Sequence, residues 1–268
     1  MFQITILFLY VVAGLSLALS RLPRFSRYCG ALLSNALIVG VIAVVWHGIT
    51  LKSTILLPDG FTLSLGDTAS FIGLLLGLTA LVTSLQPMLR GLASGMLVLA
   101  GIAAVFTGWS AVPPESTTLT WQVEAHILIS LFAYGLLTVG AIVGVYAVVQ
   151  DQRLRAGRLS PVNELFAPLE TNERLLYGIA AAGLLALVLA VFSGFAFVDD
   201  LFAQHLVHKT TLSLLAIVLF GILLAGRQFA GWRGRRAVSL YLWGFVTLGL
   251  AYFGSRYILE QILGRTWT

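Results

Sequence analysis

The chain has 268 residues, of which 59% are hydrophobic and 10% are charged, and its mean hydropathy is +0.96. Soluble globular domains do not reach this composition, so the chain is an integral membrane protein. A net charge of +5 is also typical of nucleic-acid-binding proteins, but here the arginines occupy short loops between apolar runs. Orientation in a lipid bilayer explains that placement, and we expect no nucleic-acid partner.

Apolar runs of about 20 residues predict eight helices that each cross the hydrocarbon core. The first run is followed by Arg21, Arg24 and Arg27 and has no positive residue before it, which is the reverse of a signal peptide. The predicted helices cover residues 2–20, 29–50, 66–86, 91–112, 124–149, 173–197, 206–226 and 237–258. We therefore expect an all-α membrane protein, a bundle of eight transmembrane helices that forms a single domain over residues 1–268.

The predicted loops alternate in charge along the chain. The loops after the first, third, fifth and seventh helices are basic, whereas those around residues 51–65, 113–123 and 198–205 are not. By the positive-inside rule the basic loops are cytoplasmic. This places both termini on the outer side of the membrane.

The predicted span that starts at Trp121 carries a polar stripe. His126, Ser130 and Tyr134 follow one another at intervals of four residues, so they lie on one face of a helix. A polar stripe on a spanning helix is expected to face protein or a cofactor rather than lipid.

Histidines are the strongest candidates for chemistry. His47, His126, His205 and His208 all fall at predicted outer ends. Neutral imidazole is a common axial ligand of haem iron, and two histidines from different helices can hold one iron between them. Taken singly, each histidine is also explained as a polar residue at the membrane interface, and His205, in the loop or first turn, fits that interpretation best.

Other residues at the outer ends suit the same cofactor. Lys209 and Arg256 are placed to bind the two propionates of a haem, although snorkelling of long basic side chains explains them equally well. Trp121, with Trp46 and Trp109, would stack on a porphyrin, but an aromatic belt at the interface is the default explanation.

Several other chemistries are not favoured. The single cysteine, Cys29, excludes an internal disulfide, a CxxC redox pair and a CxxCH haem attachment site. The sequence contains no HExxH, GxSxG, Walker or dinucleotide-binding motif, and no pair of carboxylates within a span. We therefore expect a protein that is not an enzyme.

Five segments together resemble the cytochrome c assembly family of membrane proteins, which includes the CcsA, CcmC and HemX types. The likeness is greatest to its HemX-like or YpjD-like inner-membrane branch, which implies a multi-pass protein of a bacterial inner (plasma) membrane with both termini on the periplasmic side. The segments are HILISLFAYGLL at 126–137, APLETNERLLY at 167–177, HKTTLS at 208–213, GWRGRRA at 231–237 and AYFGSR at 251–256. This chain departs from haem-delivering members in lacking the tryptophan-rich segment before His208 and a second outer histidine after a late helix.

The resemblance implies a haem-handling protein that assists cytochrome c assembly at the outer face. It implies His126 as a haem ligand. Taken with the outer-end residues above, we expect His47 or His208 opposite His126, Lys209 and Arg256 at the propionates, and Trp121 beside the cofactor. Its partners would be the lipid bilayer and apocytochrome c or other assembly proteins. The alternative is a non-enzymatic membrane scaffold or regulator, acting in haem biosynthesis or beside a transporter, in which the same polar residues only join helices.

Overall fold

The computed structural model describes residues 2–58, 60–109, 118–157, 165, 167–197 and 207–257. Within these ranges it confirms eight helices that are long and apolar enough to cross a membrane. They are α1 (Phe2–Leu19), α2 (Cys29–Ile55), α3 (Leu65–Ser84), α4 (Arg90–Ala104), α5 (Trp121–Arg155), α6 (Leu169–Phe197), α7 (Val207–Ala230) and α8 (Gly234–Gly249), which the short η4 (Leu250–Gly254) and α9 (Ser255–Tyr257) continue. The predicted all-α membrane fold is therefore confirmed.

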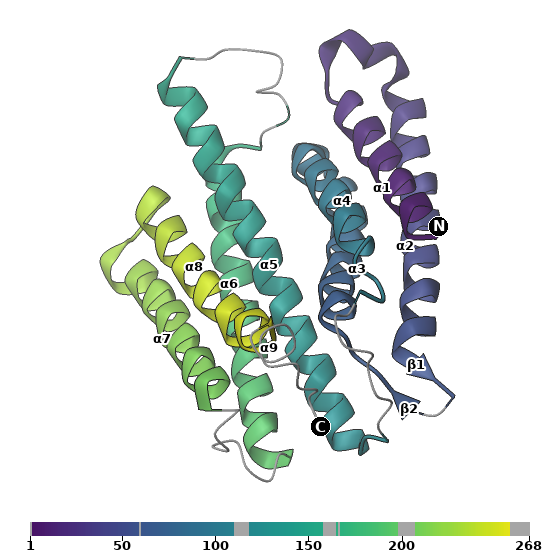
Figure 1. Cartoon of the computed structure of the whole chain (residues 1–268). Helices are drawn as coiled ribbons and strands as arrows, with labels where there is room; N and C mark the ends of the chain where they lie inside the picture. Colours follow the sequence, from purple (N-terminus) through teal and green to yellow (C-terminus); the bar gives the residue numbers. More distant parts are fainter. Residues whose placement is uncertain are drawn as a thin grey trace.

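The eight helices form two groups that lie side by side (Figure 1). Helices α1–α4, here called the N-terminal unit, pack mainly against one another, and α5–α8, the C-terminal unit, do the same. The two units meet where α3 and α4 pack against α5. Because one cluster of buried apolar residues runs through both units, they share a core. The single domain predicted over residues 1–268 stays a prediction.

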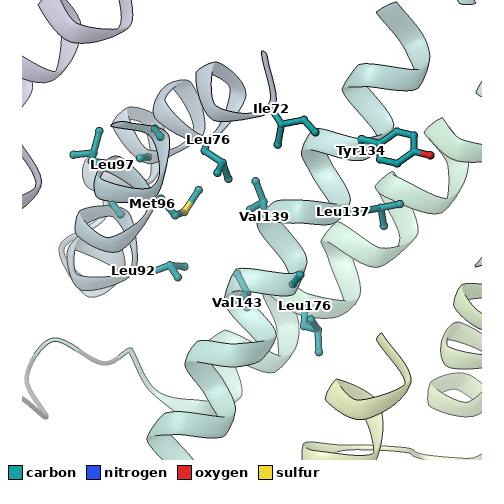
Figure 2. Packing of buried hydrophobic residues seen from close by; sticks show 14 of the residues in the cluster. Ile72, Leu76, Leu92, Met96, Leu97, Tyr134, Leu137, Val139, Val143 and Leu176 are labelled. Atoms are coloured by element: carbon teal, nitrogen blue, oxygen red, sulfur yellow. The ribbon is translucent and has the colours of Figure 1, made fainter. Parts of the chain in front are cut away.

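Small and aliphatic side chains fill the contact between the units. Figure 2 shows Leu76 of α3 and Met96 of α4 facing Val139 and Val143 of α5. Gly135 of α5 lies against the side chain of Leu75, which would have to shift to make room for an added Cβ. Without a hydrophobic driving force inside a bilayer, such close van der Waals packing is what holds spanning helices together.

The two ends of the helix bundle differ in the connections that they carry. A two-stranded antiparallel hairpin, β1 (Leu56–Leu57) and β2 (Gly60–Phe61), lies at one end, which we call the hairpin end (Figure 1). The opposite end, here called the arginine end, carries the basic connections after α1, α3, α5 and α7. The positive-inside rule predicts that the arginine end is cytoplasmic.

Three boundaries differ from the prediction by five residues or more. Helix α4 ends at Ala104 rather than near residue 112, because the chain turns through residues 105–108 and Gly108 adopts a φ of +74°. Helix α2 continues to Ile55, and α5 continues to Arg155 beyond its apolar run. Hydropathy marks only the membrane-spanning part of such helices and not their polar extensions.

The last spanning helix changes its pitch near the hairpin end. Residues Leu250–Gly254 (η4) form a π-helical segment between α8 and α9. A π-turn inserts an extra residue into an α-helix and redirects the side chains that follow, and such turns are frequent at functional sites. Here it sets the directions of Tyr252 and Arg256.

Candidate functional site

His126 lies in the second turn of α5 at the hairpin end. Its Nδ1 lies 2.9 Å from the Ser193 Oγ of α6. The Ser193 hydroxyl donates its own proton to the Ala190 carbonyl at 2.9 Å, so its oxygen is left to accept from Nδ1–H. This assigns the proton to Nδ1 and leaves the Nε2 lone pair for another partner, which is the tautomer that binds a metal through Nε2.

The backbone of α6 is shaped around this imidazole. An added Cβ at Gly194 would lie 3.1 Å from the His126 Cε1, a tighter approach than side chains normally make. Glycine therefore lets the ring lie directly against α6.

Two cations converge on one aromatic ring at the hairpin end of the C-terminal unit. The Lys209 Nζ of α7 lies 5.3 Å from the centre of the Tyr252 ring, and the Arg256 Cζ of α9 lies 5.8 Å from it. The Lys209 charge is within electrostatic reach of both His126 and Arg256. The structure thus gathers three of the predicted site residues at the hairpin end of the C-terminal unit.

Tyr252 is held from both units. Its ring packs against Tyr134, with 5.7 Å between ring centres, and Tyr134 donates to the Leu248 carbonyl at 3.3 Å. The Tyr252 hydroxyl lies 2.8 Å from the Thr68 Oγ1 of the N-terminal unit. The polar stripe predicted on α5 is therefore partly directed inward, since Tyr134 is buried and His126 is half-buried.

The remaining predicted residues of this unit lie near the same end. Trp121, in the first turn of α5, is 70% exposed and packs against Phe197 of α6, with 6.4 Å between ring centres. His208 is exposed in the first turn of α7, next to Lys209. His205 lies outside the described residues.

His47 belongs to a different network, inside the N-terminal unit. It is fully buried, its Nδ1 lies 3.2 Å from the Tyr10 hydroxyl, and its Nε2 lies 2.8 Å from the Ser70 Oγ. The Ser70 hydroxyl in turn lies 2.6 Å from the Thr107 Oγ1. Both ring nitrogens are already engaged, so this imidazole would have to release a hydrogen bond before it could bind a metal.

A buried carboxylate that the sequence analysis overlooked organises the hairpin end. Asp67 is 2% exposed and accepts four hydrogen bonds. Its Oδ2 accepts from the Ser64 N–H and hydroxyl, and its Oδ1 accepts from the Thr54 hydroxyl and the Gly108 N–H. The signal was present in the sequence as the capping box that Ser64 and Asp67 form at the start of α3.

The described residues do not form a conventional metal centre. Among them, no group of three His, Cys, Asp or Glu side chains could hold a metal ion. The donor set at the hairpin end is instead an imidazole nitrogen with two cations beside it, which suits a ligand that combines a metal with carboxylates.

Fold and composition define a multi-pass, all-helical membrane protein, and sequence comparison gives its family. The cytochrome C assembly protein family matches residues 5–263. The chain therefore belongs to the cytochrome c assembly family, which confirms the resemblance carried by the five segments.

Curated relatives agree with this assignment. The chain is 32% identical to the inner membrane protein YpjD of Escherichia coli strain K12, over 94% of this chain and 96% of the relative. It is 30% identical, over 53% of each chain, to an uncharacterized 28.8 kDa protein in the nifR3-like 5′ region of Azospirillum brasilense. No solved structure matches it. Together with the eight spans, these findings confirm the predicted location as a multi-pass protein of the inner membrane.

Proposed function

We propose that this protein binds haem at the hairpin end of its C-terminal unit and assists cytochrome c assembly there. The observation that carries the proposal is that the Lys209 and Arg256 cations converge on the Tyr252 ring, with the Lys209 charge within electrostatic reach of His126. Haem presents an iron that binds imidazole and two propionates that bind cations, so the donor set fits both parts of the molecule.

In this proposal the haem-binding residues have separate tasks. His126 offers Nε2 to the iron, because Ser193 holds the proton on Nδ1. Lys209 and Arg256 hold the propionates. The bound haem would supply the group that is passed to apocytochrome c or another assembly protein, and the proposal assigns no covalent chemistry to the chain.

The second iron ligand is proposed to be His208 rather than His47. His208 begins α7 beside Lys209 and is exposed, whereas both ring nitrogens of His47 are hydrogen-bonded in the other unit. The exposed Trp121, five residues before His126, is proposed to cover the porphyrin face.

The test is a visible spectrum of the protein purified from cells that are supplied with a haem precursor. A Soret band is expected for the wild type, and it should be lost in His126→Ala. Thermal unfolding of the variant in detergent shows whether the protein remains folded. A colourless wild-type preparation, or a His126→Ala variant with the full band, would contradict the proposal.

The alternative function is a membrane scaffold or regulator without haem. It is favoured by the fact that the polar residues of α5 already join helices, as in the His126–Ser193 and Tyr134–Leu248 hydrogen bonds. Such bonds contribute roughly 0.6–2 kcal/mol each in membranes. Under this alternative the preparation is colourless, and His126→Ala loses only stability.

A further inference from the structure

The turn between α7 and α8, at the arginine end, is a rigid reversal of the chain. Gly231 and Gly234 adopt φ values of +63° and +60°, in the left-handed region that favours glycine. The backbone N–H of Trp232 donates to the Gly226 carbonyl at 3.1 Å. The Trp232 indole lies against Gly226, where any side chain would collide with it. The Trp232 ring is therefore fixed on the last turns of α7.

Helix α6 holds this turn from the side. The Tyr177 hydroxyl donates to the Trp232 carbonyl at 2.5 Å. The Glu173 Oε1 accepts from the Gly234 N–H at 2.7 Å and so caps the N-terminus of α8. The turn is thus connected to all three helices of this corner, and the Glu173 carboxylate is already bound to backbone.

Two guanidinium groups lie on the rings that these contacts fix. The Arg227 Cζ lies 4.9 Å from the centre of the Tyr177 ring, and the Arg236 Cζ lies 5.4 Å from the centre of the Trp232 ring. Stacking on an aromatic face restrains a guanidinium while leaving its edge available for hydrogen bonds. The Arg227 Nη1 is buried and donates to no residue in the described part of the chain. The residues that the structure describes therefore do not complete the hydrogen bonding of this cation.

The charge around the turn is entirely positive on α7 and α8. Four arginines fall within residues 227–236, and the sequence has no Asp or Glu between Asp200 and Glu260. Phe229, at the end of α7, is 88% exposed. An exposed aromatic ring beside a basic cluster at the end of a spanning helix is typical of the boundary between acyl chains and headgroups.

We propose that Arg227, Arg236 and Trp232 form a binding site for the phosphate of an anionic phospholipid in the adjacent leaflet. The planar guanidinium fork matches two phosphate oxygens, and Phe229 would contact the acyl chains. The ordinary bias of cytoplasmic loops toward arginine does not explain why the Arg227 and Arg236 guanidinium groups stack on the Tyr177 and Trp232 rings. Arg24 and Arg27, in the exposed turn η1 (Pro23–Tyr28) at the same end, supply a matched comparison, since both are exposed.

The test measures lipid binding by the delipidated protein in detergent, with native mass spectrometry at increasing concentrations of phosphatidylglycerol or phosphatidylcholine. The wild type should bind phosphatidylglycerol more tightly. The double variant Arg227→Gln/Arg236→Gln should bind it roughly 25-fold more weakly, at about fivefold for each arginine near a headgroup. The control Arg24→Gln/Arg27→Gln, which removes the same charge, should remain within about twofold of the wild type.

Two further arms make the result decisive. Arg236→Lys keeps the charge but loses the planar fork, so it should also weaken binding. This variant provides the test if the double variant does not fold. Glycerol 3-phosphate should not compete at equal concentration if the partner is a lipid rather than free phosphate. Equal losses in both double variants, no preference for phosphatidylglycerol, unchanged binding in Arg236→Lys, or full competition by glycerol 3-phosphate would each overturn the proposal. None of these outcomes depends on haem, which is proposed to bind at the opposite end.

Discussion

The Tyr252 hydroxyl lies 2.8 Å from the Thr68 hydroxyl and joins the two four-helix units at the hairpin end. The Arg256 Nη1 donates to the same tyrosine oxygen at 2.7 Å, and its guanidinium also contacts the Leu63 carbonyl. Because Lys209 lies over the same ring, one side chain positions both proposed propionate partners. The packing of the units and the geometry of the proposed haem site are thus coupled through Tyr252.

Replacing Tyr252 by Phe should weaken both the packing of the two units and the proposed binding of haem. The variant keeps the ring but loses the hydrogen bonds to Thr68 and Arg256, which should lower the free energy of unfolding by ~1–3 kcal/mol. Haem affinity should fall as well, since Arg256 loses one of the two oxygens that hold it. Thermal unfolding and haem titration in detergent measure the two effects. Tyr257→Phe is the matched control, because Tyr257 is 51% exposed, and equal effects in both variants would contradict the coupling.

His47 and His126 should respond differently to removal. His47→Ala leaves the buried Tyr10 and Ser70 hydroxyls without their shared partner and creates a void, so it should destabilise the protein by ~2–4 kcal/mol. The haem absorbance of the protein that remains folded should not change, whereas His126→Ala should abolish it. Unfolding curves and spectra on the same samples separate the two effects. A stable His47→Ala protein that has lost its Soret band would restore His47 as a ligand.

The orientation of His126 gives a subtler test of the proposed ligation. Ser193→Ala removes the acceptor that holds the proton on Nδ1, and loss of such a partner typically lowers metal affinity 10–100-fold. Haem titration of the purified variant measures this effect. Ser130→Ala is the control, because that hydroxyl only donates to the His126 carbonyl within its own helix. If Ser193→Ala binds haem as tightly as Ser130→Ala, the orienting role is wrong.

The sequence was sufficient to predict the number, order and approximate extent of the helices, because each hydrophobic run is long enough to span a bilayer. It did not reveal which helices pack together. Spanning helices are apolar on all sides, so hydropathy does not distinguish a face that meets lipid from one that meets protein. For this reason the separation of His47 from His126 into different units could not be predicted.

The candidate site could be predicted only in part, because the sequence does not show which helix faces pack together. Lys209 and Arg256 were placed at one end by topology alone, and the structure brings them to a common ring. Tyr252, which supplies that ring, was not singled out, because a π-helical turn leaves no clear signal in a single sequence. Asp67 was missed because a lone acid near the start of a helix suggests an ordinary cap. Its bonds to Thr54 and Gly108 depend on how α2, α3 and the end of α4 meet.

Asp67 therefore offers a last prediction, on the stability of the hairpin end. In Asp67→Asn an amide group replaces one carboxylate oxygen and faces two donors, either from Ser64 or from Thr54 and Gly108, so two hydrogen bonds are lost at a buried site. We expect the free energy of unfolding to fall by about 2 kcal/mol, as measured by thermal unfolding in detergent. Glu124→Gln, an exposed acid in the first turn of α5, is the control and should change it by less than ~0.5 kcal/mol. Equal stability of the two variants would show that the Asp67 network does not hold α2, α3 and the end of α4 together.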